Sequence, residues 1–292
     1  MAWWSEYAAR IEPDAALDKL TWFKLGGRAK WLFRPEGVDD LASMVRRARG
    51  EGVSFRVLGA GANVLVRDDG VDGVVVRLDE PAFRDESIDG CRVTVGGGAD
   101  VMPLARRLAK AGLAGLEFMA GIPATVGGAI HMNAGGLGGE FGDVVRGVRV
   151  MKPDGTIEDW DRDRLAFGYR TSSIRDEVVL SAELELCSDD PDEIRKRYDA
   201  QFAAKRASQP LVDKSAGCIF KNPPGLSAGA LIDRAGLKGT RCGKASVSHR
   251  HANFIVADPD ARASDVLSLM DVIKRRVLDH WGMELQAEIE VW

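Results

Sequence analysis

The segment at residues 121–142, GIPATVGGAIHMNAGGLGGEFG, holds eight of the chain's 33 glycines in 22 positions. Glycine costs about 0.5–1 kcal/mol relative to alanine inside a regular element, so this density excludes an ordinary helix or strand over the whole segment. It predicts a backbone that turns sharply or lies close to a bound molecule. A flexible surface loop is the alternative, but Ile122, Val126 and Ile130 are too apolar for a solvated linker.

An anionic cofactor is the ligand that such a segment favours, because main-chain N–H groups outside regular structure can bind phosphate oxygens. A second glycine turn, LGAGANVLVRDDG, begins with the Gly59-x-Gly61 spacing of a dinucleotide fingerprint. Val64 occupies the third glycine position and a strand is expected to follow, so this turn is not a Rossmann loop. Its glycines and Asn63 predict a phosphate-facing turn, and a plain β-turn between two strands is the alternative.

Charge limits the class of ligand. The 292-residue chain has 40 Lys and Arg against 44 Asp and Glu, a net charge of −4, which argues against a general nucleic-acid or membrane-surface binder. Residues 205–250 reverse this balance, with nine basic residues against two acidic ones. This segment predicts either an anionic small ligand at one lobe or a solvated face paired with acids elsewhere.

The cysteines and histidines do not form a metal site. The four cysteines are far apart and lack C-x-x-C spacing, so we expect reduced thiols. His249 and His251 have no acid or cysteine at ligand spacing, and we expect no metal. The amino-terminal residues do not resemble a signal peptide and no stretch is long enough to span a membrane, so a cytoplasmic location is expected.

The apolar patterns predict an α+β chain in three parts: residues 1–80, a βαββ unit; residues 81–189, a second unit with the long glycine segment; and residues 190–292, a further lobe. A turn is expected at Pro153-Asp154-Gly155. A strand is expected at residues 251–256, followed by a long helix capped by Ser264, with a last strand at residues 285–292. The helix is expected to carry the core stripe Val266, Leu269, Met270, Ile273 and Val277.

Six segments occur in a diagnostic order: TWFKLGGRAKWL, LGAGANVLVRDDG, GIPATVGGAIHMNAG, FGYRTS, SAGCIFKNP and LQAEIEVW. Over nearly its whole length, the chain thereby resembles the UDP-N-acetylenolpyruvoylglucosamine reductase family. FGYR, G-x-x-F-K-N-P and the terminal glutamate are more specific than either glycine turn. The resemblance implies an FAD-binding module of the vanillyl-alcohol-oxidase type, made of two subdomains, with an appended substrate lobe of the shorter family form.

The resemblance also implies an activity. It is the NADPH-dependent reduction of UDP-N-acetylenolpyruvoylglucosamine to UDP-N-acetylmuramate through noncovalently bound FAD, in peptidoglycan precursor synthesis. The partner is a UDP-sugar, neither nucleic acid nor membrane, and a monomer is expected. Hydride addition to the vinyl β-carbon leaves negative charge that spreads into the substrate carboxylate. The site therefore needs a fixed cation near that carboxylate and an acid near the α-carbon.

Three residues match the family's catalytic positions. Arg170 in FGYR matches the arginine that stabilises the carboxylate, and an ordinary surface ion pair is its alternative. Glu288 in LQAE matches the glutamate that polarises the carboxylate. Glu284 and Glu290 lie close enough in sequence to leave that choice open, and an exposed strand glutamate is the alternative.

Cys218 departs from the family pattern, in which the proton donor to the α-carbon is usually serine. A free cysteine ionises near pH 8.5, so a thiol donates a proton readily, but a thiolate cannot donate one. We therefore expect Cys218 to act as the acid and activity to fall at alkaline pH. A small buried core cysteine is the alternative.

The resemblance and the glycine turns together give the remaining candidates. Residues expected to bind the cofactor are Gly59, Gly61, Ala62, Asn63, Gly121, Ile122, Thr125, Gly127, Gly128, Ala129, Asn133 and Ala134. Residues expected to bind the substrate are Tyr169, Lys205, Arg206, Lys221 and Asn222. Two other functions stay open: an FAD enzyme of the same fold that acts on an alcohol or lactone, and a catalytically silent nucleotide-binding protein.

Overall fold

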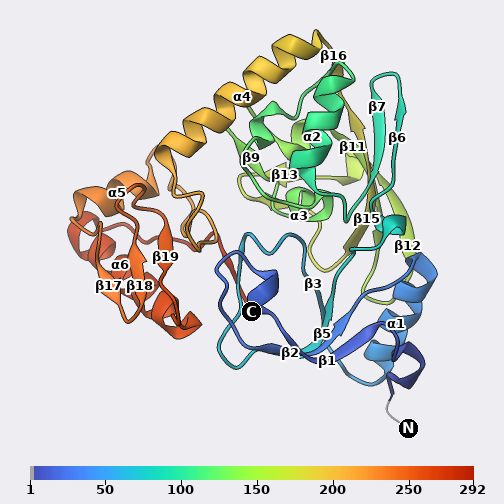
Figure 1. Ribbon diagram of the computed structural model, residues 1–292, viewed down its shortest axis with the longest axis horizontal. Coiled ribbons are helices and arrows are strands. Elements are labelled where there is room, and N and C mark those ends of the chain that lie inside the picture. Colours follow the sequence, from blue (N-terminus) through green and yellow to red (C-terminus); the bar gives the residue numbers. More distant parts are fainter. Residues whose placement is uncertain (1–2) are drawn as a thin grey trace. The chain divides into compact units, whose positions relative to one another are not determined.

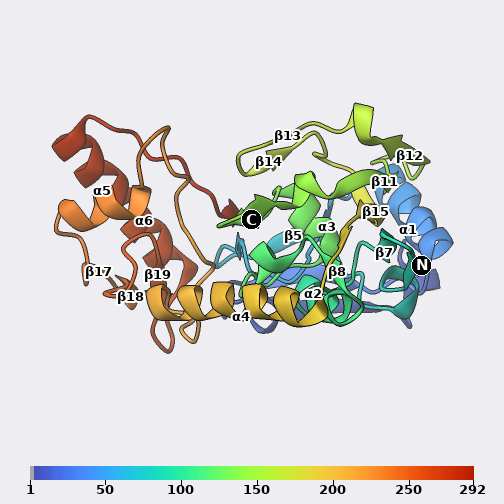
Figure 2. The same ribbon diagram turned by 90° about the horizontal axis from the view of Figure 1, so that it is seen from above.

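The computed structural model describes residues 3–292 and contains both helices and strands, with several runs of consecutive strands (Figures 1 and 2). The α+β class predicted from sequence is thereby confirmed. The chain forms two compact units. Unit 1 comprises the described residues through Asp14 together with residues 30–60 and 72–203, and unit 2 comprises residues 15–29, 61–71 and 204–292. The three-part division at residues 80 and 189 stays a proposal.

The first sheet of unit 1 has the strand order β1-β2-β5-β3, with β3 and β5 parallel. Its strands are β1 (Ile11–Ala16), β2 (Arg28–Phe33), β3 (Phe55–Val57) and β5 (Val71–Val76), and helix α1 (Val38–Gly50) joins β2 to β3. Leu41, Met44 and Val45 of α1 pack with Phe33 and Val74 in one core cluster. This arrangement agrees with the βαββ unit expected from the periodicity of the sequence.

The second sheet of unit 1 has the strand order β12-β11-β15-β7-β6, and its neighbouring strands are antiparallel. Its strands are β6 (Glu86–Asp89), β7 (Arg92–Gly96), β11 (Val145–Met151), β12 (Ile157–Asp161) and β15 (Val178–Glu185), and helices α2 (Val101–Lys110) and α3 (Val126–His131) accompany it. The predicted turn between β11 and β12 is present, with the Lys152 N–H donating to the Thr156 carbonyl at 2.8 Å.

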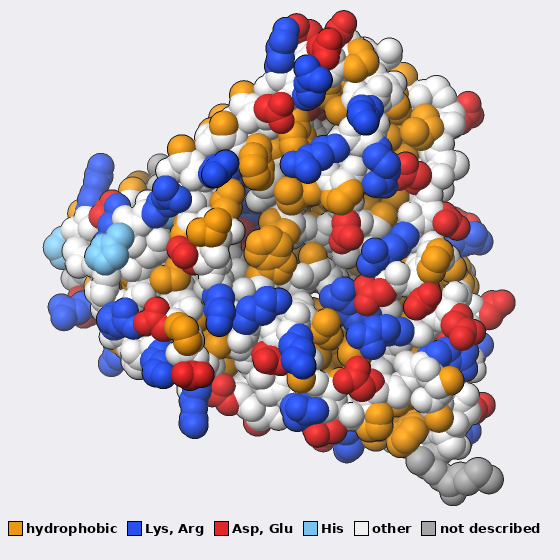
Figure 3. Space-filling view, viewed as in Figure 1, with side chains coloured by type: hydrophobic (Ala, Val, Ile, Leu, Met, Phe, Trp, Pro, Cys, Tyr) orange, Lys and Arg blue, Asp and Glu red, His pale blue; other side chains and the backbone are white. Residues whose placement is uncertain are grey.

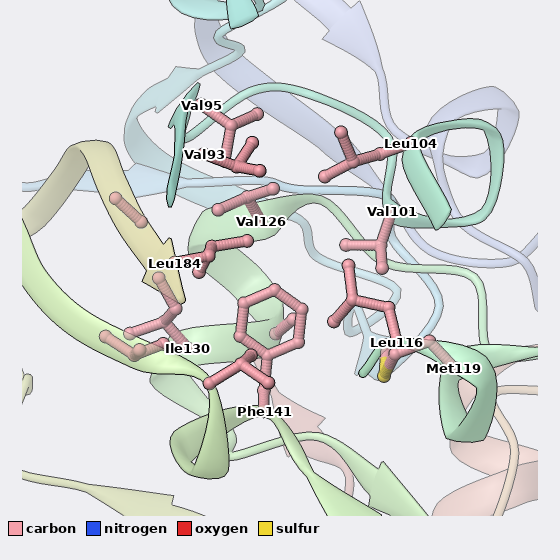
Figure 4. Close-up of a cluster of buried hydrophobic side chains, with 14 of the residues drawn as sticks. Val93, Val95, Val101, Leu104, Leu116, Met119, Val126, Ile130, Phe141 and Leu184 are labelled. Carbon is pink, nitrogen blue, oxygen red and sulfur yellow. The ribbon is translucent and has the colours of Figure 1, made fainter. Parts of the chain in front are cut away.

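Part of the long glycine segment belongs to the hydrophobic core. Val126 and Ile130 of α3 are fully buried and pack with Val93, Phe141 and Leu184, as Figure 4 shows. This burial contradicts a flexible surface loop for the stretch that forms α3. The segment instead combines an anchored helix with glycine-rich turns on its carboxyl side.

Short elements complete unit 1. They are β8 (Leu113–Ala114), β9 (Gly135–Gly136), β10 (Gly139–Glu140), β13 (Phe167–Gly168), β14 (Thr171–Ser172) and β16 (Cys187–Ser188). Helix α4 (Pro191–Ser208) begins in unit 1 and ends in unit 2. Single 3-10 turns lie at Ser5–Tyr7, Asp18–Leu20, Pro81–Phe83, Glu117–Met119, Phe141–Asp143 and Arg162–Arg164.

Unit 2 has a core of its own. It contains β4 (Val64–Leu65), α5 (Ala228–Arg234), β17 (Arg241–Cys242), β18 (Ala245–Val247), β19 (Ile255–Ala257), α6 (Ala263–Trp281) and β20 (Glu290–Val291). Strands β17, β18 and β19 form an antiparallel sheet, and β20 pairs in parallel with β4. The stripe predicted on α6 is confirmed, because each of its five residues is at most 4% exposed.

The predicted cap of that long helix is wrong. Helix α6 begins at Ala263, and Ser264 lies in its first turn. The carboxylate of Asp68 accepts hydrogen bonds from the main-chain N–H groups of Ala263 at 2.8 Å and Ser264 at 3.1 Å. Burial raises the pKa of Asp68, but the hydrogen bonds from Ser264 and Ala263 outweigh it and hold that pKa below its ordinary value. A carboxylate distant in sequence therefore satisfies the helix end.

Two predicted strands are shorter than expected. Residues 251–256 contribute only the first part of β19, and residues 285–292 form β20 and an isolated bridge between Phe220 and Ala287. The main chain of residues 286–288 instead bonds to residues 219–221. No helix among residues 3–292 is long and apolar enough to cross a bilayer.

Candidate functional site

The turn at Gly61 leaves main-chain donors unused. Gly61 has φ 67°, and a Cβ there would lie 2.1 Å from the Leu20 carbonyl oxygen, so only glycine fits. Within residues 3–292, no hydrogen bond uses the N–H groups of Gly61, Ala62 or Asn63. Three consecutive open N–H groups are chemically suited to oxygen atoms of a phosphate.

Within unit 1, Gly59 lies against the glycine segment at residues 121–142. A Cβ at Gly59 would come 2.7 Å from the Thr125 hydroxyl oxygen, so this approach requires glycine. The guanidinium of Arg77 donates to the Gly59 carbonyl at 2.7 Å and to the carboxylate of Asp79 at 2.8 Å. Burial raises the pKa of Asp79, but hydrogen bonds and charge from Arg77, reinforced by Arg84 nearby, hold it below its ordinary value. Asp79 therefore stays ionised and keeps Arg77 on the glycine turn.

The first turn of α3 is fastened to the protein by its own N–H groups. Val126 donates to the Ala99 carbonyl at 2.9 Å, and Gly127 donates to the Gly97 carbonyl at 2.8 Å. The Thr125 hydroxyl caps the helix by accepting from the Gly128 N–H at 3.2 Å. These bonds fix the position of the helix, whereas the turn at Gly61 keeps its donors open.

A buried asparagine joins the glycine segment to the FGYR motif. Asn133 is fully buried and has φ 42°, in the left-handed region. Its amide nitrogen donates to the Gly168 carbonyl at 2.9 Å, and its amide oxygen accepts from the Gly142 N–H at 2.9 Å. Arg170 also has a positive φ, 53°, and its guanidinium donates to the Gly135 carbonyl at 3.1 Å.

Tyr169 and Arg170 are the two residues at the tip of the β13–β14 hairpin, which lies beside α3 (Figures 1 and 2). The Ser172 hydroxyl donates to the His131 carbonyl at 3.0 Å and ties the hairpin to the end of α3. The guanidinium carbon of Arg170 lies 5.3 Å from the centre of the Tyr169 ring, and Tyr169 is 48% exposed. The hairpin thus presents an aromatic ring and a cation together.

Three further predicted residues, Cys218, Lys221 and Glu288, lie on neighbouring segments of unit 2. Glu288 donates its main-chain N–H to the carbonyl of Ile219, the residue after Cys218, at 2.8 Å. Lys221 similarly donates its N–H to the Gln286 carbonyl at 2.9 Å. Cys218, Lys221 and Glu288 are all partly exposed. The structure therefore brings the predicted acid, the predicted glutamate and a lysine to one pair of hydrogen-bonded segments.

Glu288 is the terminal glutamate that faces this segment. Its carbonyl accepts from the Asn63 amide at 3.1 Å, and Glu290 donates its N–H to the Asn63 carbonyl at 2.9 Å. The Asn63 side chain therefore ties the glycine turn to the carboxyl-terminal residues of unit 2. Glu284 and Glu290 are exposed, whereas Glu288 is partly buried.

The remaining substrate candidates, Asn222, Lys205 and Arg206, lie at the ends of helices or next to them. The Asn222 amide oxygen accepts from the Ala228 N–H at 2.9 Å, at the start of α5. Lys205 and Arg206 lie in the last turn of α4. Arg170 and Tyr169 belong to unit 1, and the other substrate candidates belong to unit 2.

The basic segment at residues 205–250 is partly neutralised by acids. Ion pairs join Lys238 to Asp233 at 2.7 Å, Lys244 to Asp260 at 3.4 Å, and Arg241 to Asp258. Figure 3 shows Lys and Arg side chains intermingled with Asp and Glu on the face that it views. A solvated face with local pairing thus accounts for part of the positive charge.

Three residues that hold these segments were absent from the sequence predictions. They are Arg77, Asp79 and Asn253, and the last of these bonds to the main chain of Phe220. An Arg-x-Asp pair directly after the apolar run of β5 is a weak local signal for the first two. Asn253 carries no local signal, because its partner lies 33 residues earlier in the chain.

The fold, the open donors and a family model define the class of protein. The model described as "FAD binding domain" matches residues 29–161, and the chain is an FAD-dependent oxidoreductase. The model described as "UDP-N-acetylenolpyruvoylglucosamine reductase, C-terminal domain" matches residues 209–292. The chain belongs to the UDP-N-acetylenolpyruvoylglucosamine reductase family, as the resemblance of its motifs implied.

Relatives of that name match nearly the whole chain. The chain is similar to the reductase of Heliobacterium modesticaldum, with 44% identity over 94% of this chain and 88% of the relative. It is also similar to that of Anoxybacillus flavithermus, with 41% identity over 96% and 94%. A crystal structure of the Thermus caldophilus reductase matches with a TM-score of 0.85 and 40% identity, covering 97% of this chain and 99% of that one.

Proposed function

We propose that this protein reduces UDP-N-acetylenolpyruvoylglucosamine to UDP-N-acetylmuramate with electrons from NADPH, through FAD, in the synthesis of peptidoglycan precursors. The observation that carries the proposal is the placement of Cys218 beside Glu288 on hydrogen-bonded segments, in a chain that belongs to this reductase family. A protonated thiol and a carboxyl group together are suited to a substrate whose carbanion must be stabilised and then protonated.

The residues present fit FAD. When bound, FAD supplies the hydride that reduces the enolpyruvyl group. The open N–H groups of Gly61, Ala62 and Asn63 are proposed to bind its pyrophosphate, because they are the unused donors of a glycine turn. Gly59 and the glycines of residues 121–142 are proposed to let the cofactor approach the main chain closely, because they have no Cβ. The cofactor contacts of residues 121–134 are proposed on the same ground.

Each catalytic candidate has a separate task in this proposal. Arg170 holds the substrate carboxylate with its planar guanidinium and balances the charge that develops there. Glu288, in its protonated form, donates a hydrogen bond to the same carboxylate. The Cys218 thiol gives its proton to the α-carbon, and Lys221, on the same segment, attracts the anionic substrate. Tyr169, Asn222, Lys205 and Arg206 are proposed to contact the UDP-sugar.

A monomeric, cytoplasmic protein with noncovalently bound FAD is the proposed working form. UDP-sugars and NADPH are small anionic metabolites, which agrees with the local excess of basic residues in a chain of net negative charge. Gel filtration with light scattering tests the monomer, and release of FAD on denaturation in acid tests the noncovalent attachment.

An anaerobic titration tests the function. The purified protein should be yellow, and NADPH should bleach its flavin absorbance. Addition of UDP-N-acetylenolpyruvoylglucosamine should then restore the absorbance with formation of UDP-N-acetylmuramate. Restoration by an alcohol-derived ketone instead of this substrate would favour an oxidase or dehydrogenase of the same fold. A flavin that NADPH bleaches but substrate cannot restore would favour a catalytically silent protein.

Arg77→Met should weaken FAD binding by about tenfold to a hundredfold, because it removes a charged hydrogen bond, worth about 1.5–3 kcal/mol, from the turn at Gly59. The dissociation constant of FAD, measured by fluorescence titration of the apoprotein, is the readout. Arg46→Met is the matched control, since Arg46 donates to the Gly155 carbonyl at 3.3 Å in the same manner. Equal FAD affinities for the two variants would contradict a role for Arg77 in the cofactor turn.

A further inference from the structure

Asn253 is buried beneath the segment that carries Cys218. Asn253 is 2% exposed, and both ends of its side-chain amide form hydrogen bonds with Phe220. The amide oxygen accepts from the Phe220 N–H at 3.0 Å, and the amide nitrogen donates to the Phe220 carbonyl at 2.8 Å. In addition, the main-chain carbonyl of Asn253 accepts from the Ile219 N–H at 2.8 Å. Three hydrogen bonds thus join Asn253 to the two residues after Cys218.

The opposite edge of the same segment is bonded to the carboxyl-terminal residues. The Ile219 carbonyl accepts from the Glu288 N–H, and the Lys221 N–H donates to the Gln286 carbonyl. Ile219 and Phe220 are fully buried. Residues 219–221 therefore run between Asn253 on one edge and residues 286–288 on the other. A shift of Asn253 would therefore displace residues 219 and 220, which follow Cys218 directly. Ile219 is also the residue whose carbonyl bonds to Glu288.

The bonding pattern requires an amide. A carboxylate can accept from the Phe220 N–H but cannot donate to the Phe220 carbonyl, and an aliphatic side chain can do neither. Both Phe220 groups are buried, so loss of either partner leaves a polar group without compensation. Asn253→Asp preserves the shape of the side chain and removes the donor to the Phe220 carbonyl, so it tests the contribution of that hydrogen bond.

The position of Asn253 is itself fixed by its neighbours. The Nδ1 atom of His251 accepts from the Asn253 N–H at 3.3 Å. Burial, together with the charge of Lys238, holds the pKa of His251 below its ordinary value, so the imidazole is neutral at pH 7 and keeps an acceptor. The ring of His251 also packs against Phe254, with ring centres 4.8 Å apart.

We propose that Asn253 is a positioning residue of the reductase, which holds the Cys218 thiol and the Glu288 carboxyl group in the arrangement needed to protonate the substrate. This inference rests on the proposed function and adds a specific residue to it. Both ends of the Asn253 amide bond to the segment that follows Cys218, and Asn253 is not among the residues proposed to bind FAD. Loss of its amide should therefore affect the substrate step and leave reduction of the cofactor by NADPH unchanged.

The test compares holoenzymes carrying Asn253→Ala and Asn253→Asp with the wild type in anaerobic stopped-flow experiments. Flavin bleaching by NADPH should keep its wild-type rate in both variants. Restoration of the flavin absorbance by UDP-N-acetylenolpyruvoylglucosamine should slow by about tenfold or more, since small displacements of reacting groups have large effects on rate. Val266→Ala is the stability control, because Val266 is a fully buried residue of α6 in the same core cluster.

A second measurement does not need the substrate. In a Cys187→Ser background, alkylation of Cys218 by iodoacetamide, followed by peptide mass spectrometry, should be faster in Asn253→Ala than in Val266→Ala. Two results together would support the structural role of Asn253 while refuting the proposed function. They are faster alkylation of Cys218 in Asn253→Ala, and a reduced wild-type flavin that UDP-N-acetylenolpyruvoylglucosamine does not reoxidise. The inference is overturned if Asn253→Ala and Val266→Ala slow the substrate step equally, if both half-reactions slow together, or if Asn253→Ala leaves the alkylation rate unchanged.

Discussion

Cys218→Ala should slow reoxidation of the reduced enzyme by substrate about 10²–10⁴-fold, which is the usual contribution of a positioned general acid. A methyl group has no proton to donate to the α-carbon. Cys218→Ser should keep most of the rate, because a hydroxyl at the same place can donate. Anaerobic stopped-flow absorbance, with NADPH-reduced enzyme mixed with UDP-N-acetylenolpyruvoylglucosamine, measures this step directly.

The loss in Cys218→Ala should be chemical, not structural. Cys218 is partly exposed, and the residues that follow it are held by main-chain hydrogen bonds that alanine preserves. The melting temperature and the rate of bleaching by NADPH should therefore match the wild type. Cys187→Ala, a change at an exposed cysteine of β16, should leave both half-reactions unaltered. Equal substrate rates for alanine, serine and cysteine at position 218 would refute the assignment.

The pH profile distinguishes a thiol acid from a bystander. A thiol loses its proton at alkaline pH, near 8.5 for a free cysteine, whereas a serine hydroxyl keeps its proton. If Cys218 is the acid, the substrate step of the wild type should fall at alkaline pH, and that fall should be absent in Cys218→Ser. The same alkaline fall in both proteins would assign the titration to another group.

Local periodicity was sufficient to predict the long elements but not how they end. The apolar stripe of α6 follows from a spacing of three and four residues, and its burial confirms it. The amino-terminal end of that helix depends on Asp68, which is 195 residues from Ala263 in the chain. A serine close to the helix start is a reasonable local cap, and only tertiary structure shows that a distant carboxylate has replaced it.

The sequence predicts that both glycine-rich segments contain close main-chain approaches, but it does not predict which residues bond to them. Glycine density indicates close approach, and Gly59 and Gly61 are both positions where a side chain would collide with its surroundings. The partner that holds the turn at Gly59 is Arg77, which reaches Gly59 because strands β3 and β5, which precede these two residues, pair in parallel. Such a contact depends on sheet register, which a local pattern of residues does not specify.

Family motifs in the sequence identify the catalytic candidates, whereas only the structure identifies the residues that hold them in place. The motif G-x-x-F-K-N-P identifies Cys218, but nothing in the sequence HANFIV indicates that Asn253 bonds to both main-chain groups of Phe220. Alternation along the last strand leaves Glu284, Glu288 and Glu290 equivalent. The bond from the Glu288 N–H to Ile219 separates them, because it places Glu288 next to the Cys218 segment.

Arg170→Gly should abolish most of the substrate step while leaving the fold intact. Arg170 has φ 53°, a conformation that costs a residue with a Cβ about 1 kcal/mol or more and that glycine adopts freely. This relief offsets the lost hydrogen bond to the Gly135 carbonyl, so the melting temperature should change little. Removal of the cation that stabilises the developing charge should slow reoxidation about 10²–10³-fold.

The lysine variant separates charge from geometry at the same position. Arg170→Lys keeps the positive charge but cannot form two parallel hydrogen bonds to a carboxylate, so its rate should lie between those of the wild type and the glycine variant. Arg149→Met is the matched control, because Arg149 is an exposed arginine of unit 1 that pairs with Asp159 at 3.4 Å, and its rate should equal that of the wild type.

An Arg170→Gly variant that is stably folded and as fast as the wild type would show that Arg170 does not act on the substrate. Slow bleaching by NADPH in that variant would instead place Arg170 in the reaction with the nicotinamide.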